Sequence, residues 1–151
     1  MTLKISNNRL NKYSARQQLA TAIDTGSYFT VHVPNLSGTQ SMTAGTKKYV
    51  CTLPKDATFV SASMYFSADM GTDMVSTLTA GTNVDMSTGY TAISAATTFS
   101  TAGAGVFSIA AATDSTASAG DNIVLAVATP PSNNTFVAGS FTFKLVDDPT
   151  Q

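Results

Sequence analysis

The chain has 151 residues, only 11% of them are Asp, Glu, Lys or Arg, and the formal net charge is −1. So little basic charge argues against a nucleic-acid partner, because neutralising phosphates takes a surplus of Lys and Arg. With one Cys, no Glu and one His, the chain has no intrachain disulfide and few groups for acid–base catalysis.

Residues 1–26 are predicted to form an N-terminal arm that holds half of the basic side chains. Ser14-Ala15-Arg16-Gln17 has the pattern of a capping box, which predicts a short helix over residues 15–23 after an Asn-rich extended stretch. The apolar face of this helix is thin, so the helix needs a surface to dock on. A frayed terminal tail is the alternative interpretation.

From residue 27 onward, short apolar runs alternate with turn residues, which predicts one β domain over residues 27–151. Turn residues every 8–12 positions are typical of an antiparallel sandwich or barrel. We therefore expect an all-β fold, an antiparallel β-sandwich of jelly-roll type with about eight strands. Residues 92–104, rich in Ala, Ser and Thr, fit either a helical turn or a long loop. The predicted strands cover residues 28–33, 47–53, 59–66, 74–78, 82–86, 105–111, 122–129 and 141–146.

The only histidine, His32, and the only cysteine, Cys51, each lie in the middle of a predicted strand. They would form a nucleophile and its base if their strands were neighbours. A mid-strand Cys, however, usually behaves as a small hydrophobic side chain. One Cys and one His cannot make a zinc site. We therefore predict no catalytic residues, no cofactor and no enzymatic activity.

Three acidic residues, Asp69, Asp73 and Asp85, surround the short predicted strand 74–78. Asp69-Met70-Gly71-Thr72-Asp73 offers oxygen ligands of the kind that bind Ca²⁺. The segment does not match an EF-hand loop, which ends in Glu, and Asp beside Gly is ordinary turn chemistry. We predict no metal site, and leave open whether these three carboxylates hold an ion.

Three short motifs follow one another along the chain. Thr52-Leu53-Pro54-Lys55-Asp56-Ala57-Thr58-Phe59-Val60 opens a strand through an LP-x-x-A turn, and Thr77-Leu78-Thr79-Ala80-Gly81-Thr82 follows it. Ser118-Ala119-Gly120-Asp121-Asn122-Ile123-Val124-Leu125-Ala126-Val127 forms a strand near the C-terminus. This order resembles the decoration or cement proteins that stabilise the heads of tailed bacteriophages. The chain departs from that pattern at Lys55-Asp56, where small residues are usual.

The resemblance implies a structural virion protein on the capsid exterior, made in the host cytoplasm, that bridges neighbouring major capsid protein subunits. It also implies a homotrimer, whose multivalent contacts raise avidity. No apolar run approaches the roughly 20 residues that span a bilayer, so we expect no membrane partner. The predicted capsid-binding residues of the arm are Lys4, Ile5, Arg9, Leu10, Lys12, Tyr13 and Arg16.

Three alternatives stay open. In the first alternative the chain is another virion component, namely a head fibre, a tail or adaptor part, or a receptor-binding protein. A long fibre, however, would be expected to show sequence repeats. In the second it is a carbohydrate-binding β-sandwich, although such modules stack sugars on exposed Trp or Tyr and the chain has no Trp. In the third it is a capsid protein proper, since a single jelly roll can form a small coat, although the chain is short for the shell subunit of a tailed phage.

Overall fold

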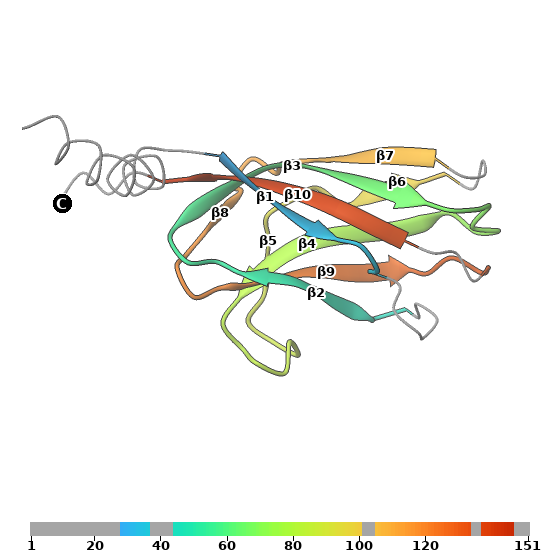
Figure 1. The fold of residues 1–151 in the computed structure, drawn as a ribbon. Coiled ribbons are helices and arrows are strands. Elements are labelled where there is room, and N and C mark those ends of the chain that lie inside the picture. Colours follow the sequence, from blue (N-terminus) through green and yellow to red (C-terminus); the bar gives the residue numbers. More distant parts are fainter. Residues whose placement is uncertain (1–27, 37–43, 101–104, 134–136, 147–151) are drawn as a thin grey trace, which may run out of the picture.

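A computed structural model describes residues 28–36, 44–100, 105–133 and 137–146. Within these ranges the chain contains strands and no helix, and the strands form two antiparallel sheets packed face to face (Figure 1). The prediction of an all-β sandwich is confirmed. The predicted arm over residues 1–26 and its helix over residues 15–23 lie outside the described residues.

Each sheet has five strands, which follow one another in space in a different order from the sequence. Sheet A consists of β1 (Tyr28–Val33), β10 (Val137–Leu145), β3 (Ala57–Phe66) and β7 (Gly105–Ala110) in that order, with β8 (Thr116–Ala117) also paired to β3. Sheet B consists of β2 (Lys47–Thr52), β9 (Asn122–Thr129), β4 (Met74–Gly81) and β5 (Thr91–Ala92) in that order, with β6 (Thr97–Phe99) also paired to β4.

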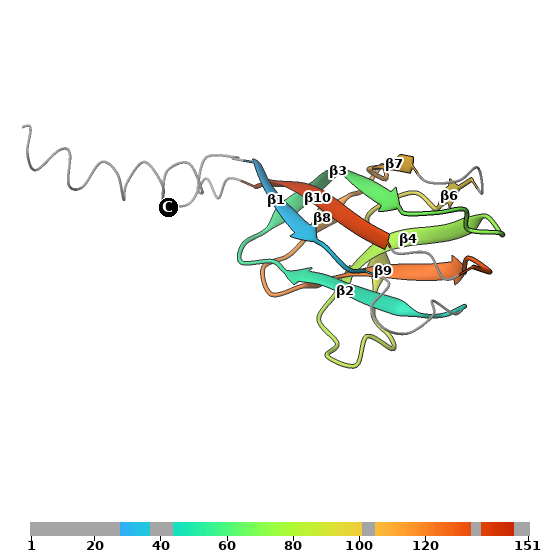
Figure 2. The same ribbon diagram turned by 45° about the vertical axis from the view of Figure 1, so that its right-hand side comes forward.

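The first four strands alternate between the sheets, so that neighbours in space come from distant parts of the chain (Figure 2). The first strand pairs with the last, and Tyr28 lies opposite Lys144. In sheet B, β9 lies between β2 and β4. The paired strands are therefore held together by long-range contacts, and the order of the strands cannot be read from neighbouring segments of sequence.

The core lies between the two sheets and follows the two-residue period of the strands. Along β10, Val137, Gly139, Phe141, Phe143 and Leu145 are buried, and the residues between them face outward. The ring of Phe143 stacks on that of Phe29 at 5.3 Å between centroids. This packing joins the edge strand β1 to the centre of sheet A.

Most predicted strands are present, and β1 and β9 have the predicted bounds. The predicted strand 82–86 is wrong, because these residues form a loop between β4 and β5. The amide of Asp85 donates to the side-chain oxygen of Asn83 at 3.4 Å, and the amide of Ser87 donates to the carboxylate of Asp85 at 2.8 Å. Such local bonds compete with the ladder of a sheet. Residues 92–100 contain β6 and no helical turn.

Candidate functional site

The seven arm residues predicted to bind a capsid lie outside the described residues, but the point where the arm joins the sandwich is described. Tyr28 begins β1, is 65% exposed, and lies opposite Lys144 near the end of β10. The first described residue of β1 therefore lies at one corner of sheet A, beside the place where β10 ends. The other predictions about functional residues fall on described parts of the chain.

The structure does not bring His32 and Cys51 together as a catalytic pair. His32 is exposed on β1 of sheet A, where its Nδ1 shares a hydrogen bond of 2.7 Å with the hydroxyl of Ser140. Cys51 belongs to β2 of sheet B and packs against the core. Burial raises the pKa of the Cys51 thiol to about 11, so the thiol stays protonated at neutral pH. The two groups therefore lack the arrangement of a nucleophile and its base.

We expect the Cys51 thiol to react slowly with iodoacetamide in the native protein. The thiolate is the reactive form, and a rise in pKa from 9.0 to about 11 lowers its fraction about 100-fold at pH values below both. Alkylation at pH 8, followed by mass spectrometry, should be at least about 100-fold slower in buffer than in urea. The native rate should keep rising up to pH values near 11. Equal rates in the two solvents would contradict the buried environment of this residue.

The three acidic residues considered as an ion site are too far apart to share one ion. Asp73 directly precedes β4 and Asp85 follows it in the next loop, and an eight-residue strand is about 23 Å long. The carboxylate of Asp69 accepts the amide of Gly71 at 2.7 Å, and that of Asp85 accepts the hydroxyl of Ser87 at 2.6 Å. The hydrogen bonds that the Asp85 carboxylate accepts from the hydroxyl and the backbone amide of Ser87 hold its pKa below the usual value. No group of potential metal ligands occurs in the described ranges.

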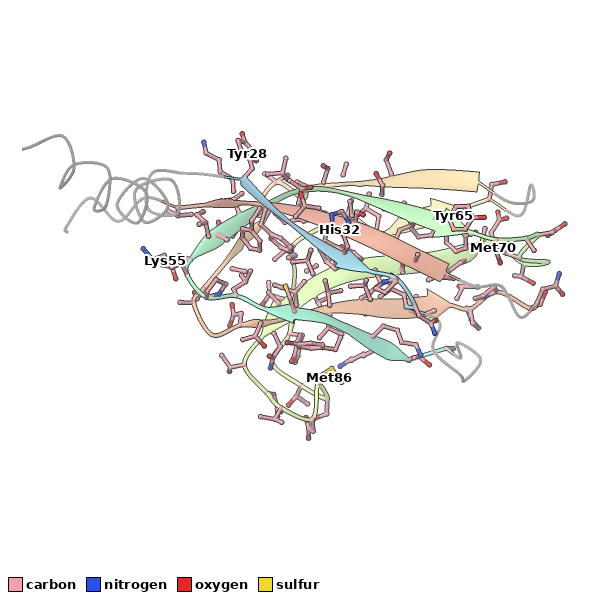
Figure 3. All side chains as sticks on the ribbon, viewed as in Figure 1. Tyr28, His32, Lys55, Tyr65, Met70 and Met86 are labelled. Carbon is pink, nitrogen blue, oxygen red and sulfur yellow. The ribbon has the colours of Figure 1, made fainter. Side chains whose placement is uncertain are left out.

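The outer side of sheet A carries a row of small polar side chains that crosses four strands. His32 lies opposite Ser140, Ser140 lies opposite Ser63, and Ser63 lies opposite Ser108. These residues come from β1, β10, β3 and β7, so the row runs the full width of the sheet. Figure 3 shows His32 on this side of the sandwich, with Tyr28 and Tyr65 further along the same sheet.

A second row lies next to the first on the same side. Thr30 lies opposite Thr142, Thr142 lies opposite Ser61, and Ser61 lies opposite Ala110. The hydroxyl oxygens of Thr30 and Thr142 are 3.0 Å apart and share a hydrogen bond. We call the outward residues of these two rows, together with Tyr28 and Tyr65, the hydroxyl face.

The hydroxyl face is absent from the predictions made from the sequence. A signal for it exists within single strands, because β3 and β10 each contain two hydroxyl residues spaced by two, namely Ser61 and Ser63 in β3 and Ser140 and Thr142 in β10. The same period assigns these positions to the outer side of a half-buried strand. What no local pattern reveals is that the strands lie side by side, since Thr30 and Thr142 are 112 residues apart.

The outer side of sheet B is organised differently, because the loop of residues 82–90 lies against it (Figure 1). The ammonium group of Lys47 donates to the carbonyl oxygens of Met86 and Ser87 and lies 5.3 Å from the centre of the Tyr90 ring. The hydroxyl of Tyr90 donates to the carbonyl of Asn83 at 2.8 Å. These bonds fix the loop to strand β2, and Figure 3 shows Met86 beyond that strand.

The outer side of sheet B also contains a buried apolar residue. Val124 on β9 is fully buried but is not part of the core between the sheets, so it faces outward. Its neighbours across the sheet are Tyr49 and Thr79. A Cβ atom on Gly81 would lie 2.6 Å from the carbonyl oxygen of Gly89, which shows how closely the loop approaches the strand. The central part of sheet B is therefore covered by the chain itself.

No protein-family model and no curated protein sequence matches this chain. Among solved structures, it is similar to a chain of the cyanophage Pam1 capsid asymmetric unit, with 18% sequence identity and a TM-score of 0.44. The similarity covers 80% of this chain and 86% of that chain. A likeness at this level carries no argument about function. In the described ranges there is also no helix long and apolar enough to cross a membrane.

Proposed function

We propose that this chain is a structural, non-enzymatic virion protein that decorates a bacteriophage capsid and stabilises it by bridging neighbouring major capsid protein subunits. In this proposal it acts as a homotrimer on the capsid exterior. The order of motifs described above motivates the proposal. The strand order also supports a jelly-roll assignment, since the chain crosses repeatedly between two sheets in which the first strand lies beside the last.

The observation that carries the proposal is the separation of charge between the arm and the sandwich. Residues 1–26 contain four basic residues and one acidic residue, a net charge of +3. The described ranges contain four Lys and six Asp, a net charge of −2. A basic segment attached to a nearly neutral sandwich suits attachment to a second, larger surface, because complementary charge speeds and orients association.

The entry point of the arm at a corner of sheet A supports bridging. An extended segment of 26 residues reaches at most about 90 Å. The arm is therefore long enough to contact one capsid subunit while the sandwich rests on another. Two such attachments on one molecule raise the effective affinity without a strong single contact.

Removal of residues 1–24 is expected to abolish attachment to capsids and leave the sandwich folded. The measurement is co-sedimentation with expanded heads of the encoding phage that lack the protein, beside a circular dichroism spectrum of each variant. We expect the apparent affinity to fall about 100-fold or more, because the second attachment is lost. A full-length variant with Lys4, Arg9, Lys12 and Arg16 replaced by Ser keeps the length of the arm and tests its charge.

A matched control is Lys55→Ala, which removes a basic side chain from an exposed turn of the sandwich and should bind like the wild type. Unchanged binding by the truncated chain would show that the arm is not the attachment element. Failure of the intact chain to bind any head would overturn the proposed function itself.

A coat protein proper is the second candidate, since the strand order that supports a jelly-roll assignment suits a small coat as well. Light scattering on the purified chain separates the two candidates. A coat protein would assemble into shells, whereas a decoration protein would give a species of about 47 kDa, three times the chain mass of 15.6 kDa.

A further inference from the structure

We propose that the hydroxyl face of sheet A is the surface through which copies of this chain contact one another. The inference deepens the proposed function, because it rests on the proposed assembly into a homo-oligomer and assigns that contact to named residues. The alternative surface, the outer side of sheet B, is partly covered by the chain's own loop of residues 82–90, which is held by Lys47 and closely approaches Gly81.

The composition of the hydroxyl face is that of the centre of a protein–protein interface. Such centres are poor in Lys, Asp and Glu and rich in Tyr. Among the described residues, neither central row contains an acidic or basic residue other than His32. Tyr28 is 65% exposed and Tyr65 is 43% exposed, near opposite ends of the face. Lys144 lies at one end, opposite Tyr28.

Burying this face costs little in lost hydration. An unpaired polar group that is removed from water is expensive, but one that already has a partner within the protein is not. Thr30 already bonds Thr142, and His32 already bonds Ser140. These two hydrogen bonds can persist when the face is buried against another protein. The other hydroxyl groups of the rows can both donate and accept hydrogen bonds across such a contact.

The absence of charge at the centre favours a second copy over a foreign partner as the occupant. In a symmetric homo-oligomer, equivalent residues of the copies lie close together near the symmetry axis, so a charge placed there would meet charges of the same sign. A nearly uncharged surface avoids this repulsion. A foreign partner is instead commonly oriented by complementary charge. That charge is concentrated in residues 1–26 of this chain and is missing from the hydroxyl face.

The size of the face predicts a weak contact. Four strands about 4.8 Å apart and about six residues long cover roughly 400 Å² in projection. A stable interface usually buries about 800 Å² on each partner. We therefore expect the copies to dissociate on dilution, with a dissociation constant at or above about 1 µM.

The experiment measures the mass of the full chain by light scattering over a range of protein concentrations. Ser63→Arg places a cation at the centre of the face on an exposed residue and should weaken association more than 10-fold, which leaves a species of 15.6 kDa. Ser61→Arg, in the adjacent row, is a second variant in case the first misfolds. Thr98→Arg is the matched control, an exposed hydroxyl residue on the other sheet, and should associate like the wild type.

The outcomes separate this inference from the proposed function. If the wild type associates and both Arg variants do so equally well, the hydroxyl face is not the contact, although the homo-oligomer stands. If the wild type remains a monomer at every concentration, the contact and the homotrimer both fail. Binding to phage heads, measured separately by co-sedimentation, then decides whether the chain still attaches to a capsid.

Discussion

Replacement of Phe143 by Ala is expected to lower the free energy of unfolding by about 3–5 kcal/mol, the usual loss when a buried aromatic ring is removed from a core. Phe143 is 0% exposed and contacts two other rings, that of Phe29 at 5.3 Å and that of Phe59 at 5.6 Å. The cavity would open between β1, β10 and β3. Domains of this size are stable by about 5–15 kcal/mol in total, so the variant would be close to unfolding.

Urea denaturation followed by circular dichroism measures this loss, and thermal unfolding should show a fall of roughly 10 °C or more. The matched control is Val84→Ala, since Val84 is 88% exposed in the loop before β5. Its stability should stay within about 0.5 kcal/mol of the wild type. A Phe143→Ala protein that unfolds at the wild-type urea concentration would show that these three rings do not form the core of sheet A.

The second large effect is expected at Gly71, in the turn between β3 and β4. Its φ angle is +69°, a conformation that costs other residues about 1–2 kcal/mol. A Cβ atom there would also lie 2.3 Å from the hydroxyl oxygen of Ser132 and 3.0 Å from the side-chain amide of Asn133. This side-chain amide donates a hydrogen bond of 3.2 Å to the backbone carbonyl of Asp69. The neighbouring turn therefore cannot move away without losing bonds.

The two turns are also joined through one carbonyl group. The backbone carbonyl of Met70 accepts hydrogen bonds from the backbone amides of Ser132 at 2.9 Å and of Asn133 at 3.1 Å. We expect Gly71→Ala to destabilise the protein by about 2–4 kcal/mol, because crowding of a packed site adds to the backbone strain. The control is Gly45→Ala, where φ is +80° and no atom lies within 4 Å. Equal losses in the two variants would mean that packing between the turns contributes nothing.

Local sequence was enough to predict the fold class and most strands, because the two-residue alternation is strong where β-branched and aromatic residues are dense. Phe141–Leu145 was predicted for this reason, whereas Val137–Ser140, the first part of β10, was not. Ala138-Gly139-Ser140 has little intrinsic preference for a strand. Gly139 and Ser140 are extended because they pair with β1 on one side and with β3 on the other, and Ala138 pairs with Tyr65 of β3. The two-residue strand β8 was not predicted either, and it pairs with β3 alone.

The hydroxyl face, the candidate contact surface, was harder to predict than the fold. The alternation in β3 assigns Ser61 and Ser63 to an outer side, but no local pattern indicates that Thr142 and Ser140 lie beside them. For residues 82–86 a strand was predicted where the structure has none, because Val84 and Met86 follow a strand-like alternation. Side-chain bonds from Asn83 and Asp85 close that segment into a loop instead. The candidate capsid-binding residues of the arm stay a prediction.

The pairing of the first strand with the last has a consequence for how the protein is made. Among the described strands, β1 has β10 as its only partner, and β10 is complete only when residue 145 has been synthesised. β1 therefore cannot pair until β10 has been made, although β1 is translated first. Pairing over such a separation is slow, with times of about milliseconds to seconds. A chain that stops before β10 would leave β1 without the strand it pairs with in the described structure.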